Sequence, residues 1–308
     1  MPNTLPFHHL RHLDIDPQTR PRGRAYISAA SGLVCENGRV YVISDDEHHL
    51  AVFDDLLAPG VLYRAFPGDL PQKKKARKRL KPDLETLFSL PASGTTRTAR
   101  LVALGSGSRP NRNLGAVIPL QADGRPAPWH RIQRFDLTPL YRPLAALLGE
   151  INIEGAMVIG DELVLLNRGL PGRSPNATAR YRLRDVLALM DGDTRALQPR
   201  SLQRFRLGTI DGVALGFTDA AALPDGGWVF SAVAEDTTDS VADGRCTGSV
   251  VGIVTPRGRR LALQRLAPTV KVEGIAVRAS ADGMTVCLVT DADDPKQSST
   301  LLLARLQR

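Results

Sequence analysis

The chain has 308 residues, of which 43% are hydrophobic, so it is long enough to bury a large core. No apolar run approaches the roughly 18 residues that a membrane helix needs, which argues against a membrane protein. The formal net charge is +8, but aromatic residues make up only 5% of the chain. Stacking platforms for bases are therefore scarce, and nucleic acid is not the expected partner.

The beginning of the chain and the cysteines both favour a cytoplasmic protein. Residues 1–13 are interrupted by prolines and histidines and contain no apolar stretch typical of a secretory signal. Cys35, Cys246 and Cys287 lie far apart in the chain and form no CxxC motif. We therefore predict free, buried thiols in a reducing compartment rather than a disulfide.

In chain order, residues 8–15 form a strand with no neighbouring partner. Four strands follow at residues 31–34, 39–44, 50–53 and 61–66, and the dipeptide Asn37-Gly38 is typical of a tight hairpin turn between the first two. The basic block at residues 73–81 is typical of a solvated, mobile segment. Binding of an acidic partner is the alternative interpretation of this block.

The rest of the chain has the same strand-rich pattern with two helical interruptions. Strands are predicted at residues 84–90, 100–104, 115–120 and 131–137, then at 153–159, 162–167, 179–183 and 202–207. Further strands follow at residues 217–223, 227–233, 248–255 and 260–266, then at 272–277, 285–290 and 300–306. A helix is expected over residues 138–149, with Thr138 as N-cap and Gly149 at its end, and a shorter helix around residues 185–190.

A short unit recurs at or near the start of each strand group: an acidic or hydroxyl residue, a small residue and an apolar run. It is found at Ser31-Gly32-Leu33, Glu85-Thr86-Leu87, Glu154-Gly155-Ala156, Asp219-Ala220-Ala221 and Glu273-Gly274-Ile275, roughly every 60 residues. Repeats containing several strands indicate a propeller. We predict an all-β, five-bladed β-propeller, a single domain over residues 1–308, closed by residues 8–15 as the outer strand of the last blade. A six-bladed β-propeller, with residues 210–213 starting an extra inner strand, is the alternative.

Because inner strands converge near the axis of a propeller, the recurring oxygen-bearing residues would meet there. Four carboxylates in a poorly solvated channel cannot all stay ionised without a cation. Ca²⁺ takes six to eight oxygens with tolerant geometry, whereas Zn²⁺ prefers His and Cys, which do not recur in the unit. We predict a Ca²⁺ site formed by Ser31, Glu85, Glu154, Asp219 (or Thr218 beside it) and Glu273. The alternative is that these acids accept hydrogen bonds from neighbouring backbone N–H groups.

The motifs resemble those of the calcium-activated nucleotidases (apyrases), which are five-bladed propellers. The resemblance is carried by residues 31–46, a serine-initiated strand, an Asn-Gly turn and a strand ending in paired aspartates. It continues with Leu84-Glu85, Ile153-Glu154-Gly155-Ala156, Gly216-Phe217-Thr218-Asp219 and Lys271-Val272-Glu273-Gly274-Ile275. The likeness implies the same five calcium ligands. It also implies catalytic candidates at Asp14, Asp45 and Asp46, although Leu13-Asp14-Ile15-Asp16 matches the aspartate-rich catalytic motif of that family only in part.

Loops after the second strands of the blades carry basic side chains suited to anions. Forked guanidinium groups at Arg109, Arg112 and Arg168 match phosphate or carboxylate. We therefore predict a calcium-dependent hydrolase of a phosphate-bearing or otherwise anionic small molecule. An esterase or lactonase using the same axial ion, and a non-catalytic binding propeller, are the alternatives, because propellers carry many unrelated activities.

Overall fold

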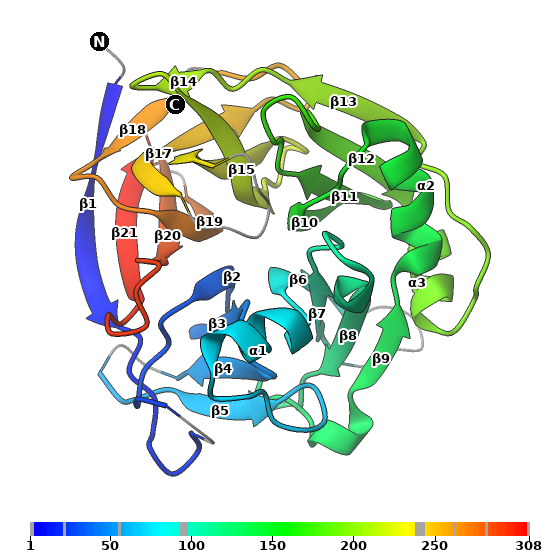
Figure 1. Cartoon of the computed structure of the whole chain (residues 1–308), viewed down its shortest axis with the longest axis vertical. Helices are drawn as coiled ribbons and strands as arrows, with labels where there is room; N and C mark the ends of the chain where they lie inside the picture. Colours follow the sequence, from blue (N-terminus) through cyan, green and yellow to red (C-terminus); the bar gives the residue numbers. More distant parts are fainter. Residues whose placement is uncertain are drawn as a thin grey trace.

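The computed structural model describes residues 3–20, 23–54, 57–92, 98–237, 244–261, 263–280 and 283–306. Its sheets are arranged radially around a central axis, as in a β-propeller (Figure 1). Strands dominate the described residues, and the helices are short. The predicted all-β, propeller-like class is confirmed. No helix in the described ranges is both long enough and apolar enough to cross a membrane.

Three of the sheets have four antiparallel strands each, in sequence order. They are formed by β2 (Ala30–Glu36), β3 (Arg39–Ser44), β4 (His49–Phe53) and β5 (Val61–Arg64); by β6 (Leu84–Leu90), β7 (Arg100–Gly105), β8 (Leu114–Pro119) and β9 (Gln133–Asp136); and by β10 (Ile153–Ile159), β11 (Glu162–Asn167), β12 (Asn176–Arg182) and β13 (Ser201–Phe205). The hairpin between β2 and β3 turns at Asn37 and Gly38, whose φ angles are 52° and 77°. Two positive φ angles are what a tight hairpin turn requires, so the dipeptide has its predicted role.

The fourth sheet has nine strands, in the order β14-β15-β16-β17-β18-β1-β21-β20-β19. Its members are β1 (Asn3–His12), β14 (Thr209–Ile210), β15 (Val213–Ala222), β16 (Trp228–Asp236), β17 (Arg245–Val254), β18 (Gln264–Ala267), β19 (Val272–Ser280), β20 (Gly283–Thr290) and β21 (Thr300–Leu306). As predicted, the N-terminal strand pairs antiparallel with β21 and so joins the two ends of the chain. Its first residues also pair parallel with β18, which was not predicted and connects two radial sheets into one.

The segment that suggested an extra blade belongs to an existing strand group. Ile210 lies in β14, Val213 begins β15, and the two residues between them form the turn of a small hairpin. This segment therefore forms a short antiparallel hairpin with the first residues of the inner strand β15.

Five inner strands surround the axis. β2, β6, β10, β15 and β19 each pack against the next, and β19 packs against β2, so the order closes on itself. Five apolar clusters fill the spaces between successive sheets around this ring. The cluster between the β6–β9 and β10–β13 sheets also receives buried side chains of two helices at the rim.

The recurring sequence unit coincides with a β-bulge in every inner strand. The pairing register shifts at Ser31-Gly32, Glu85, Glu154, Thr218 and Glu273. A bulge leaves one residue out of the ladder and redirects its side chain. The small residue of the unit has its own role, because a Cβ added at Gly32, Gly155 or Gly274 would lie 2.8–3.0 Å from backbone atoms of a neighbouring inner strand. The unit therefore combines a redirected polar side chain with close packing of inner strands.

Three α-helices and two 3-10 turns interrupt the strands. They are α1 (Lys74–Leu80), α2 (Thr138–Leu148), α3 (Leu183–Met190), η1 (Pro110–Arg112) and η2 (Trp129–Arg131). Helix α2 was predicted and ends at Gly149, with φ 86°. Its N-cap is Leu137 rather than Thr138. Asp136 accepts hydrogen bonds from both the backbone N–H and the hydroxyl of Thr138, which satisfies the helix start.

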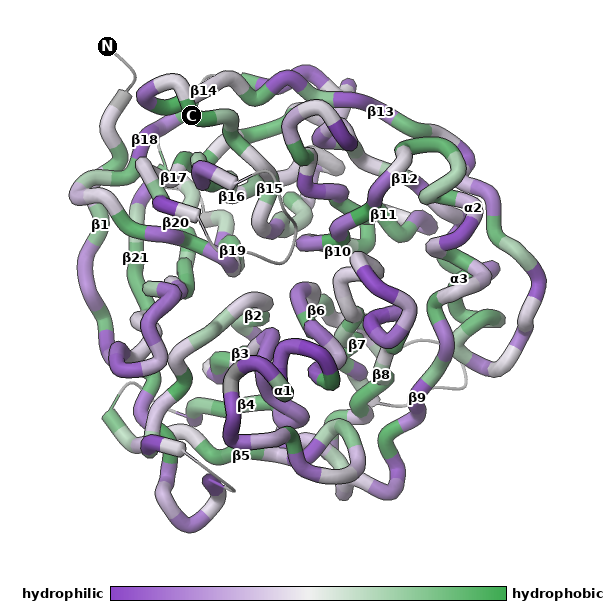
Figure 2. The backbone as a smooth tube through the Cα atoms, in the orientation of Figure 1, coloured by the Kyte–Doolittle hydropathy of each residue, from purple (hydrophilic) through white to green (hydrophobic). Residues whose placement is uncertain are grey.

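The basic block was predicted as a solvated, mobile segment, but it is helical and in part buried. Residues 74–80 of this block form α1, a hydrophilic helix (Figure 2). Lys81, directly after the helix, is only 5% exposed.

The predicted burial of the cysteines is wrong for Cys35, which is exposed, and Cys246 and Cys287 are half-buried; all three are free.

Close packing of the inner strands gives a stability prediction. In Gly274→Ala, the new methyl group would lie 2.8 Å from the Ser31 carbonyl oxygen and 2.7 Å from a methyl group of Val289. We expect a loss of about 1–3 kcal/mol of unfolding free energy, the usual cost of overpacking. Chemical denaturation measures it. Arg278→Ala, at an exposed position of the same strand, is the control and should change stability by less than about 0.5 kcal/mol. Equal stability of the two variants would contradict the packing argument.

Candidate functional site

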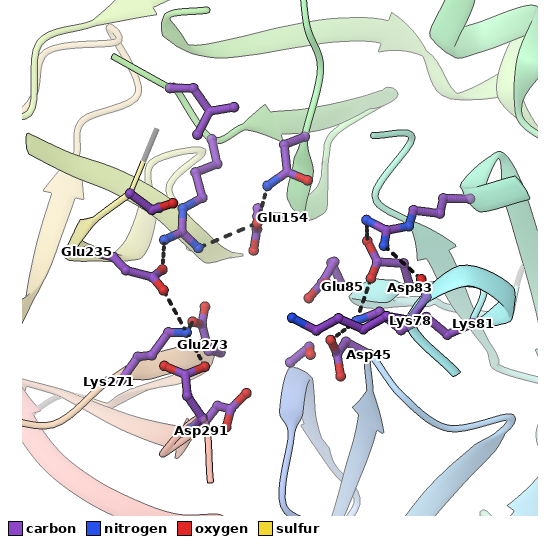
Figure 3. Close-up of a pocket in the computed structure, with 17 residues that line it drawn as sticks. Asp45, Lys78, Lys81, Asp83, Glu85, Glu154, Glu235, Lys271, Glu273 and Asp291 are labelled. Atoms are coloured by element: carbon purple, nitrogen blue, oxygen red, sulfur yellow. Dashed lines mark hydrogen bonds and ion pairs between the residues drawn. The ribbon is translucent and has the colours of Figure 1, made fainter. Parts of the chain in front are cut away.

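The inner strands enclose a polar pocket on the axis, with about 90 Å³ of internal space. Its side chains come from every radial unit of the fold and face one another across the centre (Figure 3). The lining residues are Ser31, Asp45, Lys78, Lys81, Asp83, Glu85, Arg112, Asn152, Glu154, Arg168, Leu170, Glu235, Thr237, Lys271, Glu273, Asp291 and Asp293.

Four of the five side chains predicted as metal ligands meet in this pocket. Ser31, Glu85, Glu154 and Glu273 all line it, and each lies at the bulge of its strand. Glu154 and Glu273 are 6% and 7% exposed. The repeated unit therefore places carboxylates from strands far apart in the chain around one small space.

The remaining predicted ligand, Asp219, is not among the lining residues. Its Oδ1 accepts the N–H of Ala220 at 2.8 Å, and its Oδ2 accepts the N–H of Ile275 at 3.0 Å. The bulge in β15 falls one residue earlier, at Thr218, whose hydroxyl donates to Ser231 at 2.8 Å. Asp219 therefore bonds to the backbone of β19, which was the alternative interpretation for these acids.

One side of the pocket is an ion cluster built around Lys81. The ammonium group contacts Asp45 and lies 2.7 Å from Asp83 Oδ1, and Arg112 lies 2.7 Å from the other oxygen of Asp83. Oxygens of Asp45, Asp83 and Glu85 all lie within 4.8 Å of one another, close enough to share a metal ion. The guanidinium of Arg112 also donates to Ser108 Oγ at 2.6 Å, so it braces this cluster.

The opposite side is organised by Lys271 and Arg168. The Lys271 ammonium lies 2.7 Å from Asp293, 3.3 Å from Glu273 and 3.5 Å from Glu235. Arg168 lies 2.5 Å from Glu235 and 3.6 Å from Glu154. Two of the arginines predicted to hold an anion, Arg112 and Arg168, thus line the pocket with their charges directed at carboxylates.

Acidic side chains outnumber basic side chains in the pocket. The lining includes eight carboxylates and five basic side chains. Burial raises the pKa of Glu154 to about 8. The positive charge of Arg168 acts to lower this pKa, and the negative charges of Glu273 and Asp83 act to raise it. Burial and the charge of Glu154 likewise raise the pKa of Glu85, and burial raises that of Glu273. Glu154 therefore holds its proton near neutral pH unless another cation enters.

Two of these acids have oxygens without partners. Glu273 Oε2 is buried and has no hydrogen bond. Within the described residues, the carboxylate of Glu85 forms no hydrogen bond or ion pair, although it lines the pocket. A buried polar atom without a partner is costly, so Glu273 Oε2 points to a missing ligand.

Of the remaining predicted catalytic and anion-binding residues, only one lies in the pocket. Asp45 lies in the pocket, whereas Asp46 pairs with Arg77 of α1 at 3.0 Å. Asp14 is exposed and forms an isolated bridge with Tyr26, and Arg109 is exposed at the start of η1. Neither Asp14 nor Arg109 is among the lining residues.

Sequence reasoning missed several polar residues that share one signal. Asp83, Asn152 and Lys271 each line the pocket, and each stands two positions before the acid of its unit. Each of them stands directly before the first residue of its inner strand. A polar residue at this fixed spacing before each acid is therefore the signal that could have found them.

The raised pKa of Glu154 predicts a pH-dependent stability. Between its ordinary value of 4.5 and about 8, the folded protein holds this proton and the unfolded chain does not. Stability of the metal-free protein should therefore fall as pH rises through this window. Glu154→Gln keeps the shape without the charge and should flatten the fall. Melting curves with a chelator from pH 5 to 9 measure it, with Glu150→Gln as the exposed control. If the Tm of all three proteins fell equally between pH 5 and 9, the claim that ionised Glu154 destabilises the folded protein would be contradicted.

Comparison with solved structures shows likeness of fold at low sequence identity. A bifunctional GH43-CE protein of Bacteroides eggerthii matches with a TM-score of 0.50 and 10% identity over 97% of this chain, which spans 35% of that protein. The calcium-binding protein regucalcin from Agrobacterium tumefaciens matches with a TM-score of 0.48 and 11% identity, over 100% of this chain and 98% of that one. An endo-arabinase from Bacteroides thetaiotaomicron has a TM-score of 0.48 and 12% identity, over 97% and 98%.

Sequence comparison identifies a family whose function is not known. No curated protein matches the chain. A family model covers residues 26–306, which include all five inner strands and every residue that lines the axial pocket. The chain therefore belongs to the family described as a family of unknown function (DUF6929).

Proposed function

We propose that the chain is a single five-bladed β-propeller whose axial pocket binds one hard divalent cation, with Ca²⁺ as the preferred ion. Five inner strands, five bulges and five apolar clusters support the blade count. On this count β14–β18 and β19–β21 with β1 are separate blades, joined by the parallel pairing of β1 with β18. A propeller has its ligand sites where inner strands meet, which is where the carboxylates converge.

The observation that carries the cation proposal is the surplus of carboxyl groups in the pocket, together with the unpartnered, buried oxygen of Glu273. With all eight carboxyl groups ionised, three negative charges would remain after each basic side chain of the pocket is paired with an acid. A divalent ion would offset most of this surplus and restore the ionised forms of acids whose pKa burial has raised. Oxygen-only donors suit Ca²⁺ rather than a transition metal.

The residues best placed to hold the ion are Glu85, Glu154 and Glu273, with Ser31 beside them. Asp45 and Asp83 offer further oxygens close to Glu85. Asp219 is not included, because backbone N–H groups bind both of its oxygens. The ammonium of Lys81 already contacts two of these acids, so it competes with the ion for the same side of the pocket.

We further propose that the site hydrolyses a phosphate-bearing or otherwise anionic small molecule. Asp45 and Asp293 are each 24% exposed, so the pocket opens to solvent on their side. Lys78 extends from α1 toward the centre at this opening (Figure 3) and would meet an entering anion before the buried arginines do. A bound calcium ion would polarise the substrate or lower the pKa of a water molecule. Asp45 is the best-placed candidate for a proton-accepting group.

Calcium titration after chelation tests the cation site. A ligand that binds only the folded protein raises its stability, by about 2.7 kcal/mol at a concentration 100 times the Kd. We expect Ca²⁺ to raise the Tm of the chelated wild type by several degrees. Glu85→Gln and Glu273→Gln should lose this increase, whereas Glu150→Gln, with an exposed side chain, should keep it. A Tm unchanged by Ca²⁺ in the wild type would refute the site.

Phosphate release from a nucleotide panel tests the reaction separately. We expect Ca²⁺-dependent release by the wild type, a loss of at least tenfold in Asp45→Asn, and wild-type rates in Arg109→Ala, whose side chain lies outside the pocket. Aryl-ester or lactone hydrolysis without phosphate release would favour the esterase alternative. If the protein bound Ca²⁺ but catalysed neither reaction, the result would favour the alternative of a non-catalytic binding propeller.

A further inference from the structure

Two of the three cysteines lie at the interface between the first and the last sheets of the ring. Strand β2 carries Cys35 and strand β20 carries Cys287, and these two strands pack against each other. One apolar cluster fills this interface, with Leu33 of β2 and Val289 of β20 among its buried members. Each cysteine stands two positions from one of these residues. Because side chains alternate along a strand, both thiols face into the same interface.

The two cysteines also lie at the same depth along the axis. β2 runs away from the axial pocket and places Cys35 four residues after Ser31. β20 runs toward the pocket and places Cys287 four residues before Asp291. Ser31 and Asp291 both line the pocket. At roughly 3.3 Å per residue, each cysteine is about 13 Å from the pocket, on neighbouring strands.

The thiols interact, and their environments differ. A thiol–thiol hydrogen bond raises the pKa of Cys35 and lowers that of Cys287, so Cys287 forms its thiolate first, with Cys35 as the donor. Cys35 is exposed and Cys287 is half-buried and packs against the apolar cluster. A small oxidant can therefore reach the pair from solvent, and the thiolate is the form that reacts with it.

We propose that Cys35 and Cys287 are a redox-active dithiol that a hydroperoxide closes into a disulfide between the first and the last sheets. The thiolate of Cys287 attacks the peroxide oxygen, forms a sulfenic acid and releases an alcohol or water. The Cys35 sulfur then attacks the Cys287 sulfur, the S–O bond breaks, and the departing hydroxide leaves as water with the proton of the Cys35 thiol. Two thiols lose two electrons in total, and the peroxide gains them.

The disulfide would tie together the two sheets between which the ring closes. Without it, the first and last sheets are held by the apolar cluster and by close packing of β2 against β19. A covalent bond between residues so far apart in the chain restricts the unfolded state strongly. Oxidation should therefore stabilise the ring, and a thiol reductant should reverse it. This inference does not depend on the axial cation.

Peptide mapping of the peroxide-treated, full-length protein under non-reducing conditions tests the proposal. We expect one linked peptide pair containing Cys35 and Cys287, a free Cys246, and a Tm several degrees above that of the reduced protein. Cys246→Ser should behave as wild type. Cys35→Ser and Cys287→Ser should lose both the linked pair and the increase in Tm, while their reduced forms melt as folded proteins.

Three results would overturn the proposal. One is a linked pair that includes Cys246 or joins two chains. Another is peroxide treatment that leaves three titratable thiols in the denatured wild type. The third is oxidation of Cys35 alone to a sulfinic acid, with Cys287 still free.

Discussion

The organisation of the pocket depends on mutual repulsion among buried carboxylates. Glu85, Glu154 and Glu273 come from three strands and meet in a space with little water, where like charges are costly. The raised pKa of Glu154 expresses this cost. Lys81, Lys271 and Arg168 offset part of it through ion pairs. The remaining charge is what makes a further cation the simplest complement to the site.

The inner strands explain how so many charges reach one place. A bulge at the recurring acid turns its side chain out of the ladder and toward the axis. The glycine that follows in three of the units lets adjacent inner strands approach closely. These two local features act together, because a bulky residue at the second position would separate the strands that carry the carboxylates. The same short unit therefore serves both the packing of the ring and its chemistry.

Much of this was predictable from the sequence, because the repeat is local. The strand groups, the inward acids Glu85, Glu154 and Glu273, and the pairing of the N-terminal strand with β21 all follow from periodicity. Asp219 accepts hydrogen bonds from backbone N–H groups, and the bulge of its strand lies one residue earlier, which the residue pattern does not show. The role of Asp83, Asn152 and Lys271 was missed, although their spacing before each acid carries a signal.

Other features depend on contacts between distant parts of the chain. In the basic block, Arg77 pairs with Asp46, and Lys81 pairs with Asp45 and Asp83. These acids lie outside the block, so its own sequence pattern does not predict the ion pairs. Arg112 and Arg168 were predicted to face an anion, but their charges are directed at carboxylates from other strands. The parallel pairing of β1 with β18 likewise depends on the closure of the whole ring.

The most direct test of the central claim is a crystal structure of the protein grown with Ca²⁺, with anomalous scattering recorded to locate the ion. The account predicts one anomalous peak on the axis, within 2.3–2.6 Å of oxygens from Glu85, Glu154 and Glu273. An axis without a peak, with these three acids bound only by Lys81, Lys271 and Arg168, would contradict it.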